Sequence, residues 1–220
     1  MTTRIRHHRT AWLALLGAIG LTLAFTSALE AQVGIQATPE EQQIFASDGR
    51  DLDQFGASVA IDGDTLVIGA PAADFARGGD PGAVYVFTRT GDTWTETQQL
   101  VASDAVRFNQ FGASVAIDGD NLVIGAPQFS VFGNDEESTA YVFTRTGDTW
   151  TETQQLTATG RVEGDLFGGS VAIEDDTVIV GAASDLGTLD GPQGSAYVFT
   201  QTGNTWTQIC LLYTSDAADE

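Results

Sequence analysis

The chain has 220 residues and a formal net charge of −21 at neutral pH, and all nine of its basic residues are arginine. This acidic balance excludes polyanionic partners, so we expect no nucleic-acid binding and no attraction to an anionic membrane. It fits a solvated, exported protein.

The first 31 residues predict a secretory signal peptide. Three arginines within the first nine residues precede an apolar run over residues 11–25, and small residues follow. The run is short for a membrane span. We therefore expect cleavage after Ala28 or Ala31, a secreted or cell-surface protein, and no membrane insertion after cleavage. An uncleaved anchor is the alternative.

A long internal repeat follows this leader. Phe55 recurs as Phe111 and Phe167, each time 56 residues further along, and Tyr85 and Trp94 recur with the same spacing. No insertion or deletion interrupts the register. A chain organised this way builds its core between neighbouring repeats, so the repeat decides the architecture.

Each repeat predicts four strands and no helix. In the first repeat the apolar and alternating patterns place them at 56–61, 65–70, 83–89 and 93–101. Residues 62–63 and 118–119 are Asp-Gly pairs, which form two-residue hairpin turns. The third repeat has Asp175 at the glycine position, so we expect Asp175 to adopt a left-handed backbone conformation.

These units predict an all-β fold made of propeller blades. Strands one to three are apolar on both sides, whereas strand four, "TETQQ", is polar. We expect burial to decrease from the inner to the outer strand. Four-stranded antiparallel sheets at a period of about 40 to 60 residues are typical of β-propeller blades. A β-solenoid is the rival architecture, but its repeats are much shorter.

Paired short motifs carry a family resemblance. Phe-Gly at 55–56 and 111–112 is followed at fixed distance by Gly-Ala-Pro, and Phe-Gly at 167–168 by Gly-Ala-Ala, with Ala183 replacing the proline. Over residues 42–209 the chain resembles the FG-GAP repeats of integrin α-subunit propellers and their bacterial relatives. The resemblance implies a ring of about seven blades, of which this chain would be a fragment holding about three.

The predicted organisation follows from this alignment. Residues 42–46 align with the end of a fourth strand, so we expect a lone outer strand that closes a ring as a clasp. The single cysteine, Cys210, opens a stretch that resembles a translated sequencing adapter. The predicted parts are a signal peptide (1–31), an N-terminal segment with the clasp (32–54), blade 1 (55–110), blade 2 (111–166), a truncated blade 3 (167–209) and a non-native tail (210–220).

The residues give little basis for catalysis. Between residues 32 and 209 there is no histidine, cysteine or lysine, which removes the usual nucleophile–base pairs and zinc ligands. The carboxylates of Asp62, Asp64, Asp118 and Asp120 recur with the turns, which favours a structural role over glycoside hydrolysis. We therefore expect no enzyme and no catalytic residues.

An acidic chain raises the question of calcium binding, because carboxylate oxygens are ligands of this ion. The resemblance implies a loop of the form D-x-D-x-D-G-x-x-D between strands one and two in calcium-binding repeats, but this chain has only "IDGDT", "IDGDN" and "IEDDT" there. We expect no cofactor and no family-type calcium site. Asp48, Asp51 and Asp53 are the weaker candidates for a metal cluster.

The connections between strands two and three are the candidate ligand surface. They cover 72–82, 128–138 and 184–194, are equal in length and unrelated in sequence, and lie on the same face as the links between blades. Their acidic and aromatic side chains are the predicted ligand-binding residues. These are Asp74, Phe75, Arg77, Asp80, Phe129, Phe132, Asp135, Glu136, Glu137, Asp185 and Asp190.

These loops predict a non-catalytic scaffold that binds an extracellular protein or glycan, or mediates adhesion. Neutral drift of solvent-exposed loops is the alternative reading of their variation. Two alternative functions stay open: an accessory propeller of a larger extracellular enzyme, or a structural component of the cell surface.

Overall fold

A computed structural model describes residues 41–73, 81–105, 108–127, 138–159, 164–185 and 193–213. Within these ranges all regular structure is β-strand, arranged as three four-stranded antiparallel sheets. No helix suited to crossing a membrane occurs in these ranges. The predicted signal peptide and residues 214–220 of the predicted tail lie outside them.

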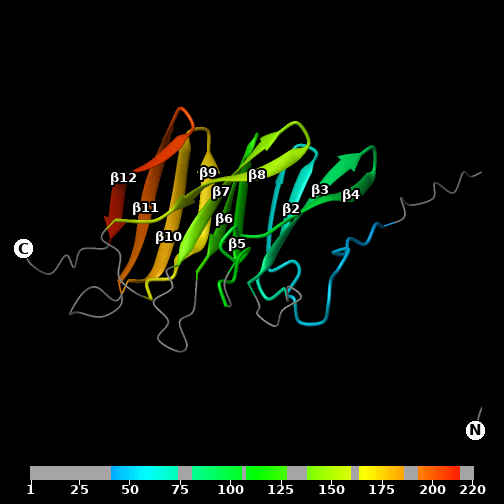
Figure 1. Cartoon of the computed structure of the whole chain (residues 1–220), viewed down its shortest axis with the longest axis horizontal. Coiled ribbons are helices and arrows are strands. Elements are labelled where there is room, and N and C mark those ends of the chain that lie inside the picture. The colour runs from blue at the N-terminus through cyan, green and yellow to red at the C-terminus, as the bar shows by residue number, and fades with distance from the viewer. Residues whose placement is uncertain are drawn as a thin grey trace, which may run out of the picture. The chain divides into compact units, whose positions relative to one another are not determined.

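The three sheets follow one another along the chain and lie side by side (Figure 1). We call them blades 1, 2 and 3. Blade 1 contains β1 (Ser58–Asp62), β2 (Thr65–Ala70), β3 (Ala83–Thr90) and β4 (Thr93–Leu100). Blade 2 contains β5 (Ser114–Asp118), β6 (Asn121–Ala126), β7 (Thr139–Thr146) and β8 (Thr149–Leu156). Blade 3 contains β9 (Phe167–Glu174), β10 (Thr177–Asp185), β11 (Gln193–Thr202) and β12 (Thr205–Tyr213).

The predicted strands and turns are confirmed to within a few residues. In every blade, each strand pairs with the next along the chain, so the sheet is a simple meander. Asp175 has the expected left-handed backbone, with φ of 50°, where the other two blades have Gly63 and Gly119. Tight turns lie at the upper edge of Figure 1, and the second strand of each blade ends, and the third begins, toward the lower edge.

The core lies between the blades. Val67, Val84 and Val86 of blade 1 pack in one buried cluster with Phe111 and Tyr141 of blade 2. An equivalent cluster joins blades 2 and 3. Each blade also repeats one aromatic arrangement, in which the phenylalanine of the Phe-Gly pair meets a tyrosine edge-on, at 5.3 Å between ring centroids for Phe111 and Tyr141. Packing between sheets therefore supplies the stability that a single sheet lacks.

The predicted order of burial is wrong. The second and third strands are the most buried, whereas no residue of β1 or β5 is fully buried. A first strand lies at a sheet edge and is covered only by the neighbouring blade. Val115 and Ile117 of β5 pack against the cluster shared with blade 1. Val59 and Ile61, the equivalent residues of β1, are 63% and 61% exposed because no described sheet covers that side.

The Phe-Gly and Gly-Ala motifs meet where two blades touch. Ser58 Oγ donates a 2.7 Å hydrogen bond to the carbonyl oxygen of Gly112, and Ser114 Oγ donates one of 2.8 Å to that of Gly168. A Cβ atom on Gly125 would overlap the Gly168 oxygen. The glycine of Gly-Ala-Pro is therefore required by the close approach of the next blade's Phe-Gly turn.

Residues 42–46 lie where the clasp strand is predicted but are not a regular strand. Gln42 exchanges two side-chain hydrogen bonds with the backbone of Trp94, at 2.7 and 2.8 Å. Gln98 makes the same pair of bonds with Trp150 of the next blade, both 2.8 Å. The segment thus has the contacts of a fourth strand from a preceding blade, without a partner strand to complete a ladder.

The fourth strand of blade 3 extends past the predicted boundary at residue 209. β12 continues through Cys210 to Tyr213, and Leu211 and Leu212 pair with Tyr197 and Ala196 of β11. Blade 3 therefore contains four paired strands. Backbone pairing depends weakly on side chains, so residues 210–213 pair with β11 although they depart from the repeat pattern.

Candidate functional site

The predicted ligand-binding residues fall almost entirely outside the described residues. Asp185 is the last residue of β10, where it pairs with Gln193 beyond a bulge. The other ten candidates lie outside the described ranges: Asp74, Phe75, Arg77, Asp80, Phe129, Phe132, Asp135, Glu136, Glu137 and Asp190.

Backbone pairing nevertheless fixes the residues at which each of the three connections begins and ends. Ala70 pairs with Ala83 in blade 1, Ala126 pairs with Thr139 in blade 2, and Ala182 pairs with Ser195 in blade 3. These are the same positions in each repeat. All three connections therefore leave the sheets at the same end of the blades.

The opposite end of the blades holds structural contacts between blades. Asp62 Oδ2 accepts a 2.8 Å bond from the Gly119 amide of blade 2, and Asp118 Oδ2 accepts a 2.6 Å bond from the Asp175 amide of blade 3. Neighbouring carboxylates pair with arginine: Asp64 lies 2.7 Å from the guanidinium of Arg89. These contacts support the structural interpretation of the turn carboxylates.

The weaker metal candidates Asp48, Asp51 and Asp53 do not form a cluster of three acidic groups within the described part of the chain. Asp48 accepts hydrogen bonds from Tyr85 Oη at 2.7 Å and from the Gln99 amide at 3.1 Å. Asp53 is buried and accepts a 2.7 Å bond from the backbone amide of Arg50. Two of the carboxylates therefore fix the loop before blade 1.

Buried tyrosines in this region are held neutral. Burial, together with the hydrogen bond to Asp48, raises the pKa of Tyr85 far above its ordinary value of 10.0. Burial likewise raises the pKa of Tyr141, which also donates a 2.8 Å hydrogen bond to Asp104. The two phenols therefore stay protonated near neutral pH and donate hydrogen bonds to Asp48 and Asp104.

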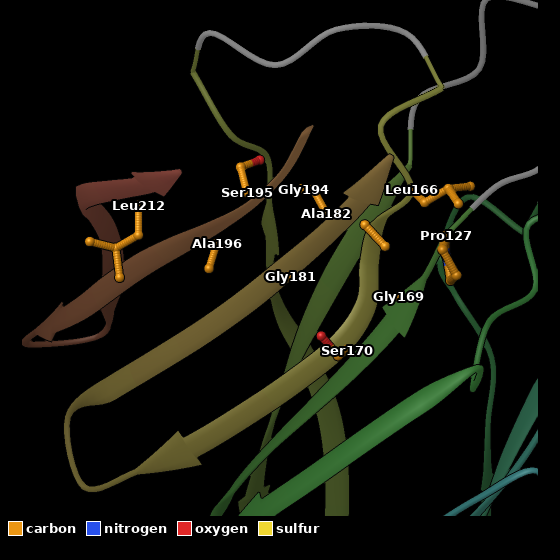
Figure 2. Close-up of a pocket in the computed structure, with 11 residues that line it drawn as sticks. Pro127, Leu166, Gly169, Ser170, Gly181, Ala182, Gly194, Ser195, Ala196 and Leu212 are labelled. Carbon is orange, nitrogen blue, oxygen red and sulfur yellow. The ribbon is translucent and has the colours of Figure 1, made fainter. Parts of the chain in front are cut away.

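A cavity of about 710 Å³ lies beside the exposed face of blade 3 (Figure 2). Ser170, Gly181, Ala182, Ser195 and Ala196 form its floor on β9, β10 and β11. Pro127, Leu166, Gly169, Ala183, Gly194 and Leu212 complete the lining.

This cavity matches positions that are filled between the other blades. Ser170 and Gly181 are the counterparts of Ser58 with Gly69 and of Ser114 with Gly125, where a Phe-Gly turn from the next blade sits. No backbone atom of a following repeat crowds Gly181 among the described residues. The cavity therefore lies at the position that a Phe-Gly turn occupies at the other two blade boundaries. Sequence reasoning missed it, although the repeat alignment contains both residues.

Comparison with known proteins supports the repeat architecture. The family model described as "FG-GAP repeat" matches residues 38–87, 94–143 and 150–199. No curated protein matches the chain.

Solved structures give weaker likenesses. A europium-containing methanol dehydrogenase is 14% identical over 70% of this chain and 23% of its own, with a TM-score of 0.45. A protein from Lactobacillus plantarum is 16% identical over 74% of this chain and 57% of its own, with a TM-score of 0.35. A periplasmic gluconolactonase from Pseudomonas aeruginosa is 12% identical over 75% of this chain and 59% of its own, with a TM-score of 0.37. The chain spans less than two thirds of each.

Proposed function

Because the chain belongs to the FG-GAP repeat family, we propose that it is an exported, non-catalytic β-propeller scaffold that binds an extracellular protein or glycan. Binding takes place through the connections between strands two and three of each blade. Export is supported by the signal-peptide pattern of residues 1–31.

The proposal rests on a difference between the two ends of the blades: residues repeat from blade to blade at one end and differ at the other. At the tight-turn end, the same residues make the same contacts in successive blades, as with Asp62 to Gly119 and Asp118 to Asp175. At the other end, three connections of equal length start from equivalent paired residues, but no position has the same residue in all three. A constant frame with varied loops is typical of binding surfaces.

The composition supports a binding role over catalysis. Outside the first 31 residues the chain has no histidine or lysine, and its buried tyrosines have raised pKa values. The acidic and aromatic residues of the connections suit recognition of a polar partner with apolar anchor points.

The test is an exchange of loops within the full chain. Residues 128–137 are replaced by residues 72–81 of the same protein, which preserves loop length and framework. Binding is measured by surface plasmon resonance to a printed glycan array and a panel of purified extracellular matrix proteins. We expect at least one ligand whose affinity falls by about tenfold or more in the exchanged variant.

A matched control changes the opposite end. The Asp62→Asn variant retains an acceptor for the Gly119 amide and should bind like the parent chain. Binding that survives the loop exchange but is lost in Asp62→Asn would contradict the proposal, as would hydrolysis of a bound glycan.

A further inference from the structure

A polar groove lies between the outer strands of blades 2 and 3. It encloses a cavity of about 370 Å³. Four threonines of β7 and β8 form one wall, and Gln201, Asn204 and Trp206 of blade 3 form the other. The groove lies near the tight turns after β7 and β11, at the end opposite the variable connections.

The groove between blades 1 and 2 provides an internal comparison, because there an arginine occupies the equivalent position. Arg145 Nε pairs with Asp120 at 2.8 Å, and its guanidinium lies 5.3 Å from the centre of the Trp150 ring. Arg145 Nη1 also donates a 3.1 Å bond to Thr65 Oγ1 across the blade boundary. Arg145 therefore has two partners in its own blade and one in blade 1.

Two substitutions change the second groove. Gln201 stands at the position of Arg89 and Arg145, and Asn204 stands at the position of Asp148. Glutamine is shorter than arginine and carries no charge, so it does not reproduce the guanidinium contacts. None of the residues that line the second groove is charged.

The groups facing this cavity suit a ligand rich in hydroxyls. Thr153 Oγ1 donates a 3.3 Å bond to the Val142 carbonyl and lies 3.1 Å from Thr144 Oγ1, so these two hydroxyls donate within the blade and present acceptor lone pairs to the groove. The side-chain amides of Gln201 and Asn204 make no hydrogen bond within the described ranges. The side chains of Gln201 and Asn204 can both donate and accept hydrogen bonds, as the hydroxyls of a sugar require.

Trp206 also lines the groove, with a side chain that is 4% exposed and packs in the core between blades 2 and 3. Its backbone amide donates to Gln154 Oε1 at 2.8 Å, and its carbonyl accepts from Gln154 Nε2 at 2.7 Å. These two bonds fix the residue across the blade boundary. The lining thus combines polar side chains with one aromatic residue. The cavity volume lies within the usual range for small-molecule sites, about 300–1,000 Å³, so the groove has room for one small ligand.

We propose that this groove binds one unit of a neutral saccharide. The uncharged hydroxyl and amide lining selects a polyhydroxylated neutral molecule, because a charged ligand would lose its hydration without gaining an ion pair. This site is separate from the variable connections, so it stands whether or not the proposed loop function holds.

The experiment titrates the full chain with glucose, galactose, mannose and N-acetylglucosamine, followed by saturation-transfer NMR and calorimetry. We expect at least one sugar to bind at millimolar to micromolar strength. Asp176 stands at the position of Asp120, the partner of Arg145 in blade 2, and its carbonyl already accepts a 2.9 Å bond from the Gln201 amide. The Gln201→Arg variant should therefore weaken sugar binding by about tenfold or more, because the guanidinium would occupy the groove and pair with Asp176. Urea denaturation should confirm that this variant stays folded.

Arg145→Gln is the matched control in the equivalent groove, and it should leave the affinity of the parent site unchanged. Exchange of residues 128–137 should also leave it unchanged, which separates this site from the proposed loop surface. The proposal is overturned if none of the four sugars binds, or if a sugar binds the parent and Gln201→Arg chains equally well.

Discussion

At the scale of single residues, small side chains at the blade boundary determine how closely two sheets approach. Gly69 and Gly125 each lie against a carbonyl oxygen of the next blade and a serine hydroxyl of their own. Gly181 lies against Ser170 Oγ, with no blade beyond it in the described part of the chain. The same motif glycine thus has a different packing requirement in blade 3.

This difference predicts unequal effects of the same substitution. Gly125→Ala should destabilise the chain by about 1–3 kcal/mol, because the new methyl group would overlap backbone that packing holds in place. Gly181→Ala should cost clearly less, since the serine side chain can rotate away. Urea denaturation of both variants gives the comparison, and equal destabilisation would argue against the stacking of blades described above.

The buried tyrosines predict a loss of stability in alkaline solution. Burial raises the pKa of Tyr141 in the folded chain above its ordinary value of 10.0. The folded state therefore retains this proton more strongly than the unfolded state does. The contribution of Tyr141 to the free energy of unfolding is complete below pH 10.0, and it is lost as the pH rises towards the pKa of the folded state. Tyr85 adds to this in the same direction.

Tyr141→Phe tests the alkaline effect, with unfolding free energy measured at several pH values on both sides of the phenol's ordinary pKa. The variant should be less stable near neutral pH, because Asp104 and Asn109 lose a buried partner. Its stability should then fall less steeply with rising pH than that of the parent chain. An unchanged slope would show that Tyr141 does not titrate with unfolding.

At the scale of elements, side-chain bonds join each blade to the strand end of the one before it. Glu152 of β8 accepts two 2.8 Å bonds from the amide and hydroxyl of Ser103. In blade 3 the equivalent residue is Gln208, whose Oε1 accepts the corresponding bonds from Thr159 at 2.8 and 3.1 Å. The contact therefore requires an acceptor oxygen, which either a charged glutamate or a neutral glutamine can supply.

That comparison predicts the outcome of two substitutions. Glu152→Gln should change the free energy of unfolding by less than about 1 kcal/mol, because the acceptor is kept in a chain already rich in negative charge. Glu152→Ala should cost about 0.5–1.5 kcal/mol more than Glu152→Gln, because two solvent-exposed donors of Ser103 exchange their protein partner for water. Thermal and urea denaturation measure both, and similar losses in the two variants would show that charge is what matters.

The elements were largely predictable from sequence, because their signals are local. Alternating residues located the strands, and the Asp-Gly pairs located the turns, including the left-handed Asp175. Burial was not predictable from one strand at a time: it depends on which sheet covers a face, so Val59 is exposed whereas Val115 is partly covered. The groove at Gln201 was missed because its origin lies in a difference between repeats.

At the scale of the whole molecule, both outer faces of the described stack expose apolar side chains. Val59 and Ile61 are exposed on blade 1, while Ile179 and Leu212, 42% and 54% exposed, lie on blade 3. Exposed apolar sheet faces favour association. We therefore expect the 220-residue chain to self-associate with rising concentration.

Light scattering during size-exclusion chromatography tests this expectation. Replacing both Val59 and Ile61 by threonine should reduce association while preserving β-propensity and the fold. A parent chain that stays monomeric and melts cooperatively at high concentration would contradict the account of open blade faces.

The central claim is that the three sheets stack as blades and stabilise one another. Hydrogen–deuterium exchange of the full chain, followed by mass spectrometry, tests it most directly. We predict the slowest exchange in β6 and β7, whose sheet is covered on both faces, and faster exchange in β2 and β3 and in β10 and β11. Equal protection of the three sheets, with Gly125→Ala affecting blade 2 alone, would contradict the claim.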